Sequence, residues 1–344
     1  MSKIKCVLVT GGAGYIGSHT CLYLLEAGYD VVVIDNLSNS KFLSLERVQA
    51  LTGKKLGFIE GDIKIKKDIN SIFRHCKIDA VIHFAGFKSV AESVTDPLNY
   101  YQNNVYGTIN LLRGMEKYSI NNIVFSSSAT VYGEALAYPI KENSVLSAKN
   151  PYGRTKLIVE EMLRDLCMSS SSWNASILRY FNPVGAHHSG AIGEDPKGIP
   201  SNIMPFISQV AVGKLDKLSI FGNDYPTVDG TGVRDYIHVV DLAKGHISAL
   251  KKLNDMPGLM THNLGTGKGW SVLQLIAEFE KVSGKKIPYK FVGRRDGDIA
   301  INYADVSHAK EDLFWEAQET LHSICQDTWR WQSKNPDGYV SETN

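Results

Sequence analysis

The chain has 344 residues, of which 43% are hydrophobic and 21% are charged. This length predicts about two domains, and this composition is typical of a folded globular protein. Its 37 lysine and arginine residues against 36 aspartate and glutamate residues leave a formal charge of +1. That balance argues against nucleic acid or an anionic membrane as the main partner, because both attract a strongly basic surface.

The cysteines and apolar runs favour a cytoplasmic location. Five cysteines are scattered without a C-x-x-C pair, at positions 6, 21, 76, 167 and 325. An odd, scattered set is typical of reduced thiols rather than a disulfide framework or a zinc site. No apolar run reaches the roughly 18 residues of a membrane span. We therefore expect no membrane partner. The adjacent His187 and His188 lack a third ligand at a suitable spacing, so we also expect no metal site.

The first third of the chain alternates short apolar runs with helical patterns. We expect strands at 6–10, 31–34, 58–60, 80–84, 123–125 and 177–181, and helices at 19–27, about 97–118 and about 151–168. Strands this apolar, separated by helices, predict a parallel sheet that is buried on both faces. The expected fold class is therefore α/β, a doubly wound parallel sheet.

A glycine-rich turn joins the first expected strand to the first expected helix. Its glycines Gly11, Gly14 and Gly17 follow the spacing G-x-x-G-x-x-G. Gly11 permits a tight turn, Gly14 lets a pyrophosphate approach the backbone, and Gly17 lets the helix pack closely on the strand. The helix N-terminus adds N–H groups and the positive end of its dipole. The pattern predicts a dinucleotide site, although such a motif alone is also typical of plain turns.

Asp35 ends the second expected strand, 18 residues after Gly17. In dinucleotide-binding folds, a carboxylate near this spacing accepts a hydrogen bond from a ribose 2′-hydroxyl. A 2′-phosphate would be repelled by the same charge, so we expect NAD rather than NADP as the cofactor. The alternative is an ordinary aspartate in a turn at a strand end.

Tyr152 and Lys156 stand at positions i and i+4 near the start of an expected helix, so they share one helical face. A tyrosine with an ordinary pKa near 10 becomes a base at neutral pH only if that pKa falls by about three units. A neighbouring ammonium and a positive nicotinamide are suited to lower it. Many helices carry such a pair by chance. Here the glycine motif earlier in the chain supports a catalytic role for it.

Ser126, Ser127 and Ser128 follow the strand expected at 123–125. In open α/β sheets the carboxyl ends of the strands face the ligand crevice. A hydroxyl there can hydrogen-bond both a sugar oxygen and the tyrosine. Taken singly, each serine is more typical of a polar turn.

Together these motifs resemble those of the UDP-galactose 4-epimerase family, within the extended short-chain dehydrogenases/reductases. The resemblance runs from about Lys5 to Tyr339. It rests on TGGAGYIGSH at 10–19, DNLSNSK at 35–41, HFAG at 83–86, SSSATVYG at 126–133, YFNPVGAH at 180–187 and IFGNDYPTVDGTGVRDYIHV at 220–239. The resemblance implies reversible interconversion of UDP-galactose and UDP-glucose with a retained NAD. It places Ser128, Tyr152 and Lys156 at the catalytic positions.

The implied reaction passes through a 4-ketopyranose. Tyr152 would remove the proton of the C4 hydroxyl while NAD+ accepts the hydride from C4. The ketone would then rotate about its link to the diphosphate, and the hydride would return to the other face. The site must therefore hold UDP tightly, the sugar loosely and the cofactor throughout.

The resemblance also assigns the remaining site residues. It implies an NAD site made of Gly11, Gly14, Tyr15, Ile16, Gly17, Asp35, Asn36, Asn39, Ser40, Asp62, Ile63, Phe84, Ala85, Gly86, Lys88, Asn103, Ser126, Tyr152, Lys156 and Tyr180. It implies a UDP-hexose site made of Ser128, Asn182, Asn202, Phe221, Arg234, Arg295, Asp298 and Asn302. Arginines suit the diphosphate and an aromatic ring suits base stacking.

Asn302 marks a departure from part of the family. Members restricted to non-acetylated sugars carry a tyrosine at this position, and its ring closes the sugar pocket. Members that accept N-acetylated sugars carry a smaller side chain. Asparagine removes the ring and offers a donor to an acetamido carbonyl, so we expect UDP-GlcNAc and UDP-GalNAc as further substrates. The alternative is that Asn302 only fills space.

Beyond about Val184, glycine and proline recur and the chain becomes loop-rich, with short helices such as 272–283. We expect residues 1–183 to form an NAD-binding Rossmann domain that includes the catalytic helix. Residues 184–344 would form a smaller, mixed α/β UDP-sugar-binding domain interleaved with the first. The resemblance further implies a homodimer through the helices near 97–118 and 151–168.

Two alternatives stay open from the sequence. Another nucleotide-sugar epimerase or dehydratase would share the fold, but related 4,6-dehydratases carry Thr-Asp-Glu where this chain has Ser-Ala-Thr at 128–130. A non-catalytic NAD-binding scaffold would normally lose the tyrosine or the lysine of the active pair. Both Tyr152 and Lys156 are present.

Overall fold

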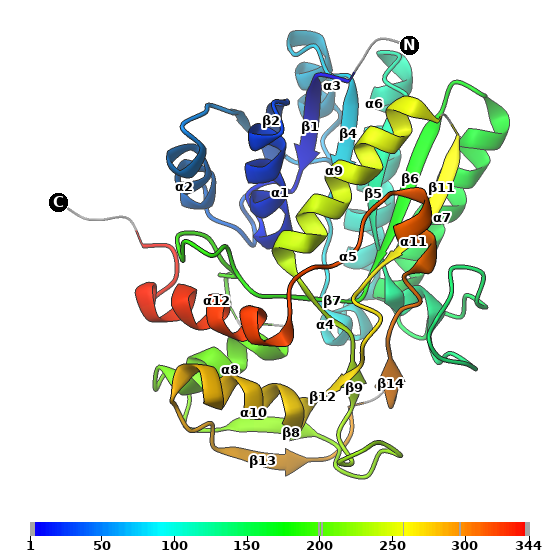
Figure 1. The fold of residues 1–344 in the computed structure, drawn as a ribbon. Coiled ribbons are helices and arrows are strands. Elements are labelled where there is room, and N and C mark those ends of the chain that lie inside the picture. Colours follow the sequence, from blue (N-terminus) through cyan, green and yellow to red (C-terminus); the bar gives the residue numbers. More distant parts are fainter. Residues whose placement is uncertain (1–3, 199, 201, 257, 296, 341–344) are drawn as a thin grey trace.

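The computed structural model describes residues 4–198, 200, 202–256, 258–295 and 297–340. Its centre is a seven-stranded sheet in the order β11-β6-β5-β4-β1-β2-β3 (Figure 1), and every neighbouring pair is parallel. The strands are β1 (Cys6–Thr10), β2 (Asp30–Asp35), β3 (Gly57–Glu60), β4 (Ala80–His83), β5 (Asn122–Ser128), β6 (Asn174–Tyr180) and β11 (Leu259–Leu264). This is the doubly wound order with one strand added at an edge. The predicted fold class is confirmed.

Helices cover both faces of this sheet. One face packs against α1 (Tyr15–Glu26), α2 (Leu43–Thr52) and α9 (Val239–Asp255), through a core that includes Val9 and Leu24. The other face packs against α3 (Lys66–His75), α6 (Gly107–Lys117) and α7 (Pro151–Ser169), through a core that includes Leu8 and Leu163. Leu8 and Val9 serve opposite faces because side chains alternate along a strand. This double burial explains why the strands are continuously apolar.

A smaller lobe lies beyond the carboxyl ends of the strands (Figure 1). Its elements are β7 (Asn182–Val184), α8 (Ile203–Ala211), β8 (Leu218–Phe221), β9 (Val233–Arg234), β10 (Tyr236–His238), β12 (Trp270–Ser271), α10 (Val272–Ser283), β13 (Tyr289–Val292), β14 (Ile301–Asn302) and α12 (Leu321–Lys334). Met204, Leu275 and Ile324 belong to its core. The segments α9 and β11 return to the large sheet, and α11 (Ser307–Asp312) packs beside β11. The division between 183 and 184 stays a prediction.

The segment expected as one helix over about 97–118 is divided. After α4 (Val90–Thr95), it consists of α5 (Pro97–Tyr100), the π-helix η1 (Tyr101–Tyr106) and α6. In η1, Asn104 Oδ1 accepts the Phe87 N–H at 2.8 Å, and Nδ2 donates to the Thr155 hydroxyl at 3.0 Å. These tertiary bonds accompany the wider helical turn, a feature that is often found at functional sites.

Candidate active site

The glycine turn leads from β1 into α1 as predicted. Gly11 has a φ of 70°, and a Cβ there would lie 2.8 Å from the Ala85 backbone nitrogen. A Cβ on Gly17 would meet the Gly11 carbonyl oxygen and lie 2.7 Å from Gly12 Cα. Gly14 is the N-cap of α1 and provides no side-chain cap. The first-turn N–H groups therefore suit a phosphate.

Asp35 lies beside this turn at the carboxyl end of β2 and is 8% exposed. One carboxylate oxygen accepts the Ala13 N–H at 3.0 Å. The other accepts the Leu37 N–H and the Ser40 hydroxyl, both at 2.9 Å. An ionised carboxylate has about four acceptor positions. Three bonds orient the group and leave capacity for a ribose hydroxyl.

The residues assigned to the adenosine end gather near the ends of β2 and β3. Asn36 Nδ2 donates to Asp62 Oδ2 at 3.1 Å, and the neighbouring Ile63 is buried. Asn39 Oδ1 accepts the Lys197 N–H at 3.0 Å. The last contact joins this end of the predicted NAD site to the second half of the chain.

The segment 84–86 follows β4 and passes beside the glycine turn. A Cβ on Gly86 would lie 3.3 Å from Asn104 Oδ1 and 3.8 Å from Lys156 Nζ. Asn103 donates from Nδ2 to the same Asn104 oxygen at 3.0 Å. Gly86 therefore lies between η1 and the predicted catalytic lysine, where a side chain would narrow the space.

Lys88 and Asn202 meet at one carboxylate. Lys88 Nζ and Asn202 Nδ2 both donate to Glu194 Oε1, at 2.9 and 2.8 Å. Glu194 is thus shared between a residue assigned to NAD and a residue assigned to UDP. None of the sequence motifs pointed to Glu194.

The helix α7 places Tyr152 and Lys156 one turn apart. Asn150 caps the helix by accepting the Gly153 N–H at 2.8 Å. Lys156 Nζ lies 5.9 Å from the centroid of the Tyr152 ring and donates to the Ser126 carbonyl oxygen at 2.6 Å. These contacts join the start of α7 to the end of β5.

Ser128 completes the trio at the end of β5. Its Oγ accepts the Thr130 N–H at 3.2 Å and the Thr130 hydroxyl at 3.0 Å. Burial raises the pKa of Tyr152, and a hydrogen bond with the Ser128 side chain opposes that rise. Burial lowers the pKa of Lys156 to about 8, because desolvation disfavours the charged form. The structure brings the three predicted catalytic residues together.

Tyr180 ends β6, in register with Ser128 of β5. Its hydroxyl is hydrogen-bonded to Nε2 of His246, and His246 Nδ1 lies 2.8 Å from the Leu242 carbonyl oxygen. A carbonyl only accepts, so Nδ1 carries the proton and Tyr180 donates to Nε2. Burial lowers the pKa of His246 to about 4, which keeps the ring neutral at pH 7. Nothing in the sequence pattern pointed to His246.

The residues assigned to UDP lie in the smaller lobe. Arg234 Nη2 lies 3.6 Å from Asp298 Oδ1, and Asn302 pairs with Arg234 across β14 and β9. The Arg295 guanidinium carbon lies 3.7 Å from the centroid of the Phe221 ring. The Asp298 N–H donates to the Arg295 carbonyl oxygen at 3.1 Å, which links the two groups.

Asn182 provides a link from these residues to the sheet. It begins β7, two residues after Tyr180. Its N–H donates at 2.9 Å to the carbonyl oxygen of Asp235, the residue after Arg234. The predicted UDP residues therefore start close to the carboxyl end of β6.

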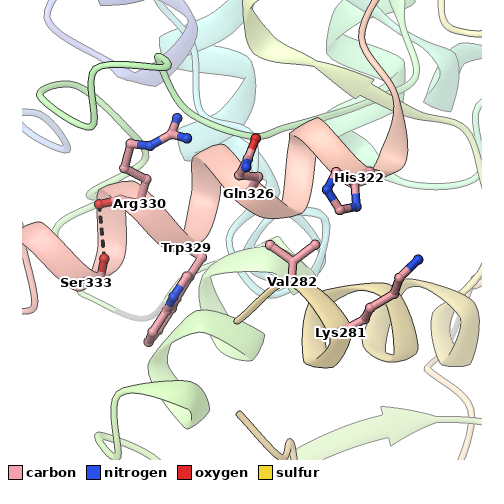
Figure 2. Close-up of a pocket in the computed structure, with 7 residues that line it drawn as sticks. All are labelled: Lys281, Val282, His322, Gln326, Trp329, Arg330 and Ser333. Atoms are coloured by element: carbon pink, nitrogen blue, oxygen red, sulfur yellow. Dashed lines mark hydrogen bonds between the residues drawn. The ribbon is translucent and has the colours of Figure 1, made fainter. Parts of the chain in front are cut away.

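A separate open groove of about 480 Å³ lies between α10 and α12 (Figure 2). Its lining residues are Lys281, Val282, His322, Gln326, Trp329, Arg330 and Ser333. His322 pairs with Glu278 at 2.7 Å, and Arg330 pairs with Asp327. All of the lining residues fall outside the set predicted from the sequence, so this groove is not part of the candidate active site.

Comparison with known proteins gives the family. A family model described as GDP-mannose 4,6 dehydratase matches residues 8–328. The UDP-glucose 4-epimerase of Bacillus subtilis (strain 168) is 59% identical over 335 residues, which cover 97% of this chain and 99% of that protein. The chain belongs to the UDP-glucose 4-epimerase family.

Two solved structures of epimerases share the fold closely. UDP-glucose 4-epimerase from Bifidobacterium longum, in complex with NAD+ and UDP, has a TM-score of 0.95 and 50% identity, and the match covers 97% of this chain and 100% of that chain. The UDP-Glc/GlcNAc 4-epimerase of Campylobacter jejuni has a TM-score of 0.83 and 36% identity, covering 96% and 99%. The family predicted from the sequence motifs is confirmed.

Proposed function

We propose that this chain catalyses the reversible epimerisation of UDP-galactose and UDP-glucose at C4. The observation that carries the proposal is the grouping of Tyr152, Lys156 and Ser128 at the carboxyl end of β5, where Lys156 lies near the segment 84–86 that passes the glycine turn. Similarity over nearly the whole chain to UDP-glucose 4-epimerases supports the same reaction.

NAD is the cofactor that these residues fit. The turn at 11–17 would hold the pyrophosphate at the N-terminus of α1, and Asp35 would accept from the ribose. Residues 84–86 and Tyr180 would line the nicotinamide end. When bound, NAD+ supplies a hydride acceptor for C4 of the sugar.

Tyr152 would take the proton of the 4-hydroxyl and later return it. The Lys156 ammonium stabilises the phenolate because opposite charges favour the ionised form. With a pKa of about 8, Lys156 keeps most of its charge at neutral pH. The Ser128 hydroxyl would hold both the sugar oxygen and the Tyr152 oxygen while the proton moves.

The smaller lobe would hold UDP while the keto sugar rotates and presents its other face to the cofactor. Arg234 and Arg295 would bind the diphosphate, since guanidinium groups match its planar sets of oxygens. Phe221 would stack on uracil, and Asp298 would accept from the uridine ribose. Asn182 and Asn202 would lie along the diphosphate. If the protein binds the intermediate through its UDP part alone, the keto sugar can rotate while the intermediate stays in the site.

We propose UDP-GlcNAc and UDP-GalNAc as further substrates because of Asn302. Its side chain is buried, and its Oδ1 has no hydrogen-bond partner among the described residues. A buried amide oxygen without a hydrogen-bond partner is costly. An acetamido group would match it, since Asn302 can accept from its N–H and donate to its carbonyl.

A product assay separates the alternatives. The purified protein, with the cofactor it retains, is incubated with UDP-galactose, and the nucleotide sugars are resolved by chromatography. UDP-glucose as the product supports the proposal. A 4-keto-6-deoxy product would indicate a dehydratase, and an intact substrate beside retained NAD would indicate a non-catalytic scaffold. Either outcome overturns the proposal.

We also propose a homodimer through the outer face of α5, η1, α6 and α7. These helices contact one another. They leave large apolar side chains exposed, namely Leu98, Tyr106, Ile109, Ile158 and Met168. Exposed apolar side chains on neighbouring helices favour association with a second copy.

The proposed location is the cytoplasm. All five cysteines are free in the structure, which supports a reducing compartment. Among the helices of the described residues, none combines the length and the apolar character needed to cross a membrane.

A further inference from the structure

A buried ion pair lies behind the catalytic helix. The side chains of Glu160 on α7 and Arg179 on β6 are 0% and 1% exposed. Arg179 Nη2 lies 2.6 Å from Glu160 Oε2, and Arg179 Nε donates to Oε1 at 3.0 Å. Replacing a buried pair by neutral groups of similar volume is often neutral or stabilising. Stability alone therefore does not account for this pair.

The pair touches the two strands that end in the active site. The Ser127 hydroxyl donates to Glu160 Oε1 at 2.6 Å, and Ser127 is the register partner of Arg179 across β5 and β6. The next register pair is Ser128 and Tyr180. A movement of Glu160 would therefore shift α7 relative to the ends of both strands.

Arg179 also holds the chain that enters α7. Its Nη1 donates to the Tyr132 hydroxyl and to the Glu142 carbonyl oxygen, both at 2.9 Å. Arg164 stands one turn after Glu160 and is partly exposed. Its Nη2 lies 3.1 Å from Glu160 Oε2. The Glu160 carboxylate therefore lies between two guanidinium groups, of which Arg179 is fully buried and Arg164 is partly exposed.

Glu160 lies one helical turn beyond Lys156 and acts on its charge. Burial lowers the pKa of Lys156, and the negative charge of Glu160 opposes that fall. Tyr152 faces Lys156 from the same helix, and His83 faces it from β4. Burial lowers the pKa of His83 to about 3, so that ring is neutral. Among these groups, Glu160 supplies the negative charge at neutral pH.

We propose that Glu160 and Arg179 are positioning residues for the epimerase centre. The carboxylate neutralises Arg179, so that no uncompensated positive charge acts on Lys156, and it ties α7 to β5. The inference rests on the proposed function, because it takes Lys156 as the cation that supports Tyr152. Its consequence is that Glu160 sets the upper pH limit of activity without touching the substrate.

The test is the pH dependence of kcat for the NAD-loaded enzyme. Lys156 supports catalysis only when protonated, so activity is present below its pKa and is lost above it. Glu160→Gln leaves Arg179 unpaired and should move this alkaline limb to lower pH by about one to two units. The double variant Glu160→Gln/Arg179→Met also removes the unpaired positive charge, so it should show a smaller shift than Glu160→Gln, although the charge of Glu160 beside Lys156 is still missing. Glu161→Gln, an exposed neighbour that pairs with Arg164, should keep the wild-type limb.

An unmoved limb in Glu160→Gln, or an equal shift in the single and double variants, would overturn the proposal. If Glu160→Gln does not fold, the double variant decides: a limb at lower pH than that of the wild type supports the proposal, because the charge of Glu160 is missing there too, and an unmoved limb refutes it. Tyr152→Phe distinguishes a failure of the proposed base from a failure of the proposed role of Glu160. Full activity in that variant would refute the proposed base, whereas an inactive Tyr152→Phe beside an unshifted Glu160→Gln would refute only the role of Glu160.

Discussion

Burial shifts the pKa values of Tyr152 and Lys156 in opposite directions. Burial raises the pKa of the phenol and lowers that of the ammonium, because each neutral form is favoured when water is removed. The phenol is therefore protonated at neutral pH in the protein alone. Positive charge must approach for it to become a base, and a bound NAD+ would bring that charge. This arrangement couples proton removal to the presence of the oxidised cofactor.

The phenol is tested by Tyr152→Phe. We expect kcat to fall by about 10²–10⁴-fold, since this is the usual contribution of a general base. NAD retention, read from the absorbance of the purified protein, should not change. Tyr289→Phe alters an exposed tyrosine on β13 and serves as the control. Retention of more than about a tenth of wild-type turnover by Tyr152→Phe would refute the assignment.

Asn302 is tested by Asn302→Tyr. The wild type should epimerise both UDP-galactose and UDP-GlcNAc. The tyrosine ring would fill the space proposed for the acetamido group, so the variant should lose N-acetyl epimerisation by at least about tenfold while keeping the other activity. Parallel kcat/KM measurements with both substrates check this. A wild type inactive on UDP-GlcNAc, or a variant with undiminished N-acetyl activity, contradicts the extended substrate range.

At the scale of elements, the glycine turn sets how closely α1 approaches β1. Gly17→Ala would place a methyl group against the Gly11 carbonyl oxygen, so the helix must shift. We expect a loss of about 1–3 kcal/mol in the free energy of unfolding, together with weaker NAD retention. Gly293→Ala meets nothing within 4 Å and should stay within about 0.5 kcal/mol. Denaturant unfolding with cofactor release checks both, and an unaffected Gly17→Ala would show that the contact is not needed.

The elements of the sheet could be predicted from sequence because their signals are local. The apolar run at 6–10 and the helix at 272–283 have the predicted bounds. The π-helix η1 had no such signal, since it accompanies bonds from Asn104 to Phe87 and Thr155 that form only in the folded chain. Glu194 and His246 were missed for the same reason. Glu160 could have been identified from the sequence, because it stands four residues after Lys156 on the same helical face.

At the scale of the molecule, the sequence predicted a sheet and a smaller second part, but the return of β11 to the sheet edge was not foreseen. The strand β11 pairs with β6, and the helix α9 that precedes it in the chain packs on the face shared with α1. A long-range pairing of this kind leaves no periodic trace in the sequence. The roles of the glycine turn, Asp35 and the Tyr152/Lys156 pair were argued from spacing and chemistry, those of the other site residues came from motif resemblance, and all of them stay predictions.

The proposed dimer is tested by placing charge on the exposed apolar face. Ile109→Glu combined with Ile158→Glu puts a carboxylate on α6 and on α7. We expect the double variant to sediment as a monomer, because an unpaired carboxylate is costly in an apolar interface. Leu136→Glu, at an exposed position outside these helices, should keep the wild-type mass. A wild type that is already monomeric, or a double variant that stays dimeric, contradicts the proposed interface.

In the proposed reaction, C4 is oxidised and reduced within one site that never releases the ketone. This is measured by converting UDP-galactose that is labelled with deuterium at C4. We expect UDP-glucose that keeps the deuterium at C4, with no exchange against solvent, because the same hydrogen returns to the carbon it left. Loss of the label to water, or its appearance at another carbon, would rule out this reaction.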